Sequence, residues 1–162
     1  MVSPLLAWAL QPSDDLNEVI AAKEMMTGNL WFTWSQLLGY IFRVPNVLAN
    51  GASSCFFGIG MMLQLIDDLG DTPVDDKFHA QNLFLALARQ VPNEWHILQD
   101  FLAVQEELFL NWKWVRTNIP QIYTNAMVLY AGYMERVQCD TPQSEVAHEL
   151  VEVVERLRHL AG

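Results

Sequence analysis

The sequence predicts an all-α protein built as a helical bundle. Apolar residues make up 52 % of the 162 positions, which is enough for one sizeable core. Long stretches repeat their apolar residues at helical spacing and end near proline or glycine. No stretch shows the strict alternation of apolar and polar residues that is typical of a strand. We therefore expect one helical domain over residues 1–162, with an irregular arm at 1–12.

The first two helices carry the longest apolar patterns. The first is expected from about Leu16 to about Phe42, with Ser13 or Asp14 as its N-cap. After a break at Pro45, the second is expected over about 47–69. Small residues recur along this second helix and favour the close approach of another helix: Gly51, Ala52, Ser53, Ser54, Gly58 and Gly60.

The rest of the chain is predicted to form shorter elements. An acidic loop is expected at 70–76 and a third helix at about 82–90. A fourth helix is expected over about 94–117 and a fifth over about 120–137. A last helix is expected from Thr141 onward, because a capping residue is followed there by proline in the first turn.

Charge and cysteine content exclude several classes of function. The net charge of −10 argues against binding to nucleic acid or to an anionic membrane surface. No run of eighteen apolar residues is free of polar breaks, so we expect no integral membrane segment. The N-terminus lacks a basic region and predicts no signal peptide. Cys55 is expected to be buried and no disulfide framework is visible, which favours a reducing, cytoplasmic setting.

The most informative stretch is 60–71, which reads G-M-M-L-Q-L-I-D-D-L-G-D. On a helix, residues three and four apart share a face, so Gln64 stands with Asp67, Asp68 and Asp71. Carboxylate oxygens suit Mg²⁺, which usually takes one or two carboxylates beside water and substrate phosphate. The alternative interpretation is an acidic helix end in solvent, stopped by the glycine and proline that follow.

This stretch resembles the second aspartate-rich motif of the trans-isoprenyl diphosphate synthases, the polyprenyl synthetase family, with Leu63 where phenylalanine is usual. The resemblance implies the class I isoprenoid synthase fold. It also implies that Asp67, Asp68 and Asp71 bind Mg²⁺, which grips the diphosphate of an allylic isoprenoid substrate. Gln64 would orient the carboxylates or the substrate.

A second stretch, 26–32 with Gly39, resembles the K-T-G-x-L-F…G segment of the same synthases. The resemblance implies that Thr27 faces the diphosphate. Met26 replaces the lysine, so Lys23, one turn earlier, is the basic candidate. Close helix packing is an equally good explanation of Thr27. The neighbouring aromatic residues are expected in the core: Trp31, Phe32 and Trp34.

The loop after the acidic motif departs from the family. It is short and acidic, with Lys77 and His79 as its basic residues, and Lys77 is the candidate for contact with phosphate. Phe84 stands where the family has proline. The shorter spacing resembles that of the squalene/phytoene synthase branch, whose motif lacks the adjacent aspartate pair.

The resemblance extends from Lys23 to Ala88 and concerns the C-terminal half of a synthase. The family's first aspartate-rich motif has no counterpart here, so a homo- or hetero-oligomer, half of an enzyme, or an inactive relative is expected. The function predicted is that of a Mg²⁺-dependent prenyltransferase of isoprenoid biosynthesis, and no catalytic residue is assigned. One alternative is a non-catalytic helical interaction or regulatory subunit. Another is a terpene cyclase or an enzyme like squalene/phytoene synthase.

Other metal chemistry finds no support in the sequence. No two histidines stand four apart, as a helical zinc site requires. Glu106 and Glu107 have no histidine at the spacing of a di-iron carboxylate bundle.

Overall fold

The computed structural model describes residues 13–43, 46–104 and 110–140, together with positions 152 and 156. Within these residues the chain forms helices and no strand, which confirms the all-α prediction. None of these helices is both long enough and apolar enough to span a membrane. Several predicted features lie outside the described residues, among them the arm at 1–12, the pair Glu106-Glu107 and most of the helix after Thr141.

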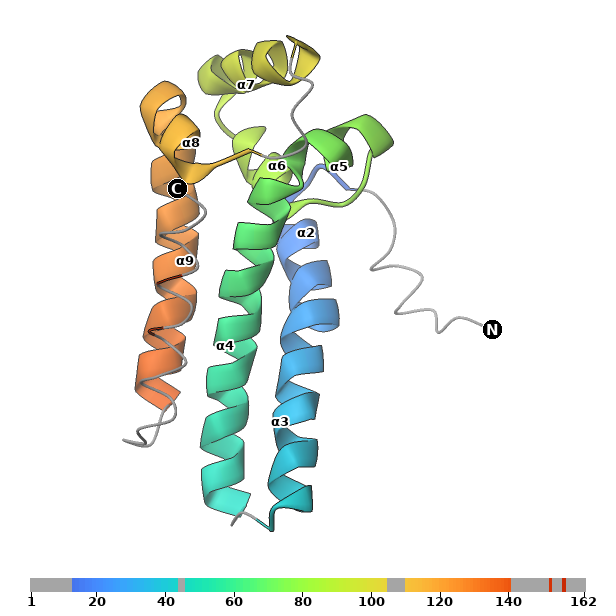
Figure 1. Cartoon of the computed structure of the whole chain (residues 1–162), viewed down its shortest axis with the longest axis vertical. Helices are drawn as coiled ribbons and strands as arrows, with labels where there is room; N and C mark the ends of the chain where they lie inside the picture. Colours follow the sequence, from blue (N-terminus) through green and yellow to red (C-terminus); the bar gives the residue numbers. More distant parts are fainter. Residues whose placement is uncertain (1–12, 44–45, 105–109, 141–151, 153–155, 157–162) are drawn as a thin grey trace.

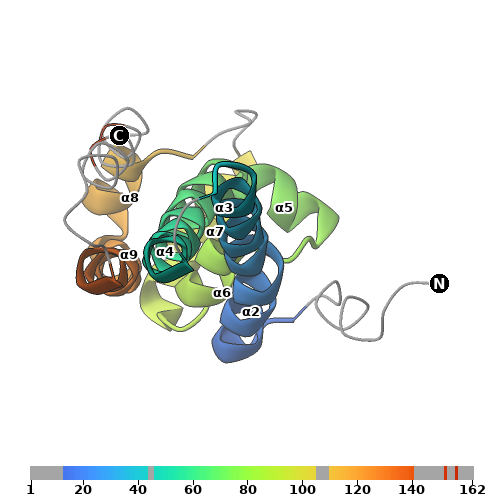
Figure 2. The same cartoon turned by 90° about the horizontal axis from the view of Figure 1, so that it is seen from below.

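Helix α4 (Asn46–Gly70) is the central element (Figure 1). On one side lie α2 (Leu16–Lys23), the π-helix η1 (Glu24–Gly28) and α3 (Asn29–Ile41), which follow one another as a continuous rod. On the other side lies α9 (Pro120–Asp140), and the view along the helices in Figure 2 shows the same order. The core is built around α4 and includes its fully buried residues Met61, Met62, Leu65 and Leu69.

Short helices gather at the acidic end of α4 (Figure 1). They are α5 (Thr72–Phe78), α6 (Leu83–Ala88) and α7 (Pro92–Val104), while α8 (Trp112–Asn118) packs against α9. All six residues of α6 are buried. This end of the molecule therefore surrounds the acidic motif with other helices.

The small residues of α4 allow the close helix contacts that the sequence predicts. A Cβ atom on Gly58 would lie 2.5 Å from Cγ2 of Val137, so α9 approaches α4 at a distance that only glycine permits. A Cβ atom on Gly60 would lie 2.4 Å from the ring of Trp31, on the side of α3. Cys55 is also buried, as predicted.

The N-cap prediction for the first helix is wrong by one residue. Asp15, not Ser13 or Asp14, has the extended backbone of a cap, and its side chain accepts hydrogen bonds from the amides of Asn17 and Glu18. The reason is register: Asp15 directly precedes the first helical residue, and a short side chain there reaches the exposed amides of the first turn.

The acidic loop predicted at 70–76 is also wrong, because most of it forms α5. Asp71 is the N-cap residue, proline stands in the first turn, and Asp75 lies in that turn as well. Proline and carboxylates are favoured at a helix N-terminus by backbone geometry and by the macrodipole. The same residues that end α4 therefore start the next helix, which closes at His79 with a left-handed backbone (φ 53°).

The single fourth helix predicted over about 94–117 is wrong as well. The structure has α7 and α8 instead, with Leu110 and Asn111 outside any helix. The Asn111 side chain accepts a hydrogen bond from the amide of Trp114 at 2.9 Å, so it caps α8. Asparagine competes with helix continuation by bonding to nearby backbone amides.

The expectation of buried aromatic residues on the first helix is wrong. Trp34 is more than half exposed, Phe32 is exposed and Trp31 is half-buried. The reason is the packing of α3, which buries the small residues Ser35 and Gly39. Close contact through small residues leaves the bulky ones on the other faces of the helix.

Candidate functional site

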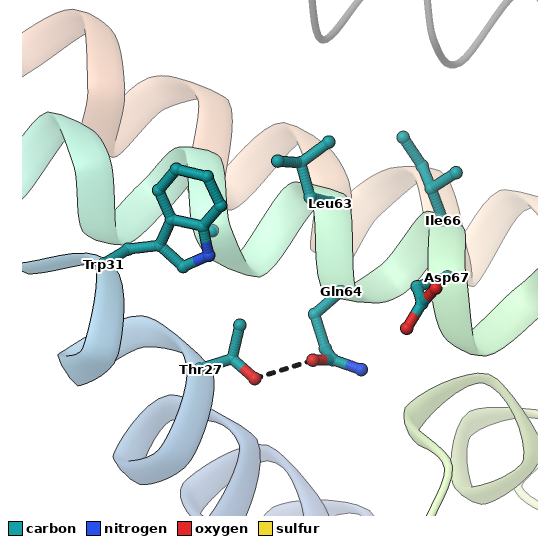
Figure 3. A pocket seen from close by; sticks show the side chains of 7 residues that line it. Thr27, Trp31, Leu63, Gln64, Ile66 and Asp67 are labelled. Carbon is teal, nitrogen blue, oxygen red and sulfur yellow. Dashed lines mark hydrogen bonds between the residues drawn. The ribbon is translucent and has the colours of Figure 1, made fainter. Parts of the chain in front are cut away.

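A cavity of about 360 Å³ opens between the η1–α3 rod and α4 (Figure 3). It is lined by seven residues of these elements: Thr27, Trp31, Gly60, Leu63, Gln64, Ile66 and Asp67. Three of them, Thr27, Gln64 and Asp67, are among the residues that the family resemblance singles out. The predicted motifs, about forty positions apart in the chain, thus meet at one cavity.

The polar end of the cavity is built by Thr27, Gln64 and Asp67. The hydroxyl of Thr27 donates to Oε1 of Gln64 at 2.6 Å, the bond drawn in Figure 3. Thr27 belongs to η1, and π-helical turns are rare and often occur at functional sites. Asp67 follows Gln64 by three residues and lies on the same side of α4.

The apolar wall is formed by Trp31, Leu63 and Ile66 (Figure 3). Trp31 stacks on Phe56 of α4, with ring centroids 6.3 Å apart. Gly60 leaves room for this indole, as its missing Cβ would collide with the ring. One cavity therefore offers an apolar surface next to a group of polar side chains.

Asp68, next to the cavity residue Asp67, lies in a different environment. Its side chain is 3 % exposed, and its Oδ1 forms an ion pair with Nζ of Lys23 at 2.9 Å. The same oxygen accepts a hydrogen bond from Nε2 of Gln64 at 2.5 Å. The other oxygen, Oδ2, accepts from the amide of Leu83 at 2.6 Å. Asp68 therefore ties the end of α2 and the start of α6 to the end of α4.

Asn82 completes this buried network. Its Nδ2 donates to the backbone carbonyl of Asp68 at 2.5 Å and to Oδ2 of Asp75 at 2.8 Å. Its Oδ1 accepts from the amide of Leu85 and caps α6. The hydroxyl of Thr72 donates to the same carbonyl of Asp68. We call Lys23, Asp68, Asn82 and the side chains bonded to them the Asp68 network.

The two aspartates differ in what perturbs their acidity. Burial raises the pKa of Asp68, while Lys23, the amide of Leu83 and Gln64 each act to lower it. Its N–H donors suit the ionised carboxylate. Partial burial raises the pKa of Asp67 and the charge of Asp71 raises it further, against a lowering by Lys23. Asp67 therefore carries a negative charge that its surroundings disfavour.

The donor set fits a magnesium ion in part. Asp67 lines the cavity and is close enough to Asp71 for the two charges to interact. One or two carboxylates are what Mg²⁺ commonly takes beside phosphate. Asp68, as folded, gives its oxygens to Lys23, Gln64 and Leu83. In the part of the chain that the structure describes, no three His, Cys, Asp or Glu side chains converge as metal ligands.

The remaining predicted residues do not line the cavity. Lys23 is engaged with Asp68. Asp71 begins α5, and its backbone carbonyl accepts from the amides of Val74 and Asp75. Lys77 is exposed on α5, with its ammonium 5.9 Å from the ring centroid of Phe78.

Two residues of this region, Trp31 and Asn82, have roles that the sequence does not predict. Trp31 was expected in the core but lines the cavity; its spacing of four from Thr27 on a helix was the available signal. Asn82 was expected only to begin a helix. Its contacts with Asp68 and Asp75 depend on tertiary packing, and no local pattern predicts them.

Comparisons of the chain with protein-family models, with curated proteins and with solved structures found no match.

Proposed function

We propose that this protein binds an allylic isoprenoid diphosphate together with Mg²⁺, as a prenyltransferase-like component of isoprenoid biosynthesis. The observation that carries the proposal is the meeting of Thr27, Gln64 and Asp67 at the polar end of a cavity with an apolar wall. An isoprenoid diphosphate has the matching division, with an anionic head and a hydrocarbon tail. The tail would lie along Trp31, Leu63 and Ile66.

The metal would be held by Asp67 and Asp71. A diphosphate beside these two carboxylates is repelled unless a cation lies between them, so binding should require Mg²⁺. When bound, the ion would neutralise charge on the diphosphate and polarise its oxygens. The raised pKa of Asp67 agrees with this role, because a carboxylate disfavoured by its neighbours gains most from a cation.

Thr27 and Gln64 would orient the head group. An amide nitrogen carries two hydrogens, so Gln64 can donate one to Asp68 and the other to a phosphate oxygen. Its carbonyl is held by Thr27, which fixes the direction in which the amide points. In this scheme Lys23 and Asp68 act through Gln64, as positioning residues that do not touch the ligand.

The test is calorimetric titration with a non-reactive allylic diphosphate analogue, with and without Mg²⁺. The wild-type protein should bind only when Mg²⁺ is present, and Asp67→Ala should abolish that binding. The matched control is Asp100→Ala, which removes an exposed carboxylate on α7 that does not line the cavity. Metal-dependent binding that survives Asp67→Ala would sink the assignment.

A second candidate function is a non-catalytic helical interaction subunit. The observation in its favour is the row of exposed apolar side chains on α3. It predicts no Mg²⁺-dependent binding of the analogue and no effect of Asp67→Ala on assembly. The same titration therefore separates the two candidates.

A further inference from the structure

The outer face of α3 carries an apolar stripe. Leu30, Trp34, Leu37 and Ile41 follow one another at spacings of four, three and four residues, which places them along one side of the helix. Each of these side chains is between 48 and 58 % exposed. The residues that α3 buries, Ser35 and Gly39, lie on the opposite side. We call these four residues the α3 stripe.

The stripe belongs to a larger apolar surface. Two further exposed apolar side chains of α3, Leu38 and Tyr40, flank it on either side. Given the usual areas of large side chains, these six residues together expose on the order of 700 Å². The largest apolar patch of a monomer is about 300–600 Å², whereas each partner in a stable interface buries about 800 Å². The exposed surface is thus larger than the usual patch of a monomer and approaches the area that one partner of a stable dimer buries.

Charge points to a second copy of this chain as the occupant. The chain carries a net charge of −10, so two copies repel one another over most of their surfaces. Helix α3, from Asn29 to Ile41, contains no Asp, Glu, Lys or Arg. A two-fold axis brings the same patch of both subunits together, and a neutral apolar patch tolerates this best.

The spacing of the stripe also fits a helix as its partner. Apolar residues alternating at four and three positions form the seam along which two helices pack. Trp34, near the middle of the stripe, supplies a large side chain of the kind that anchors interfaces. A second α3 offers the same four residues in return.

We propose that two copies of this chain associate through the α3 stripe, with α3 of one subunit packed on α3 of the other. The interface is independent of the diphosphate proposal, since it uses none of the residues that line the cavity. Trp31, which does line the cavity, directly follows the first residue of the stripe. The stripe and the cavity thus use adjacent positions of α3 that face different directions.

The test is sedimentation equilibrium on the full chain over a range of micromolar concentrations. The wild type should have the mass of a dimer. The double variant Trp34→Glu with Leu37→Glu should have the mass of a monomer, because each subunit would place two charges in the apolar seam. The matched control is Val128→Glu, which changes an apolar side chain on α9 that is 68 % exposed, and it should stay a dimer.

Circular dichroism of the same samples checks that the variants fold. If the double variant loses helicity, Leu37→Gln with Ile41→Gln replaces it, and a fall in dimer affinity is again expected. A wild type that stays monomeric overturns the proposal. So does a dimer that survives both α3 variants, or an assembly that keeps growing as concentration rises, which indicates a head-to-tail contact without a two-fold axis.

Discussion

Asp67 and Asp68 are neighbours on α4, yet they belong to two different regions of the molecule. Asp67 lines the open cavity and makes an unfavourable interaction with Asp71. Asp68 is buried and paired with Lys23. A helix turns by 100° per residue, so adjacent side chains point in clearly different directions. Two adjacent carboxylates of one acidic motif thus divide between the wall of an open cavity and a buried structural network.

Gln64 connects these two regions. Its carbonyl accepts from Thr27 at the cavity, and its amide nitrogen donates to Asp68 in the network. The position of the cavity's polar end therefore depends on the buried ion pair. Substitutions at these residues test whether the cavity and the Asp68 network can be changed independently of each other.

The largest effect is expected from Asp68→Ala. Removal of this carboxylate leaves the Lys23 ammonium and the amide of Leu83 without their acceptor in a buried site. Breaking a buried ion pair on one side costs about 3–5 kcal/mol of unfolding free energy. Urea unfolding followed by circular dichroism measures this loss.

A second substitution tests the cause of that loss. In the Asp68→Ala background, Lys23→Met should recover part of the stability, because it removes the unpaired ammonium. If Asp68→Ala unfolds within about 1 kcal/mol of the wild type, the network is not structural. Asp68 would then be free to turn outward as the third metal ligand that the family resemblance implies.

A smaller effect is expected from Gln64→Met, which removes the link between the two regions while keeping a side chain of similar length. The loss of two partly buried hydrogen bonds should lower the unfolding free energy by about 1–2 kcal/mol. Gln121→Met, at an exposed position on α9, is the matched control and should change stability by less than about 0.5 kcal/mol. Equal stability of the two variants in urea would mean that the hydrogen bonds of the Gln64 side chain do not contribute to the free energy of unfolding.

Much of the fold could be predicted because its signals are local. Helical periodicity and the positions of proline and glycine place α4 and α9 within a few residues of their ends. Helical spacing also places Gln64 and Asp67 on one side of α4, and both line the cavity. The errors at α5 and at Asn111 concern capping, where one residue decides between a loop and a helix start.

The rest depends on contacts between residues distant in sequence. The partners of Asp68 come from Lys23, 45 positions earlier, and from Leu83, 15 positions later. No local pattern shows which aspartate of the motif turns inward to meet them. The exposure of Trp34 likewise follows from the packing of α3 on α4. Hydrophobicity alone predicts a tryptophan to be buried.

The smallest effect is expected from Asp67→Asn, and its sign depends on pH and on metal. In the folded protein the pKa of Asp67 lies above its ordinary value of 3.8, so the native state binds more protons than the unfolded chain between these two values. The carboxylate therefore lowers stability as pH rises through that window, and the penalty is complete above it. Without metal at pH 7, Asp67→Asn should raise the melting temperature by about 1 °C, since the site is largely solvent-screened.

Scanning calorimetry in EDTA at several pH values measures this difference, which should vanish below pH 3.8. Mg²⁺ should reverse its sign at pH 7, because an ion bound to the folded wild type stabilises it by mass action and the variant lacks the ligand. Asp100→Asn on α7 is the control and should show neither effect. If Asp67→Asn is less stable than the wild type in EDTA at pH 7, Asp67 has a partner in the folded state. The contrast between Asp67, whose negative charge the fold disfavours, and Asp68, whose charge is paired with Lys23, would then be wrong.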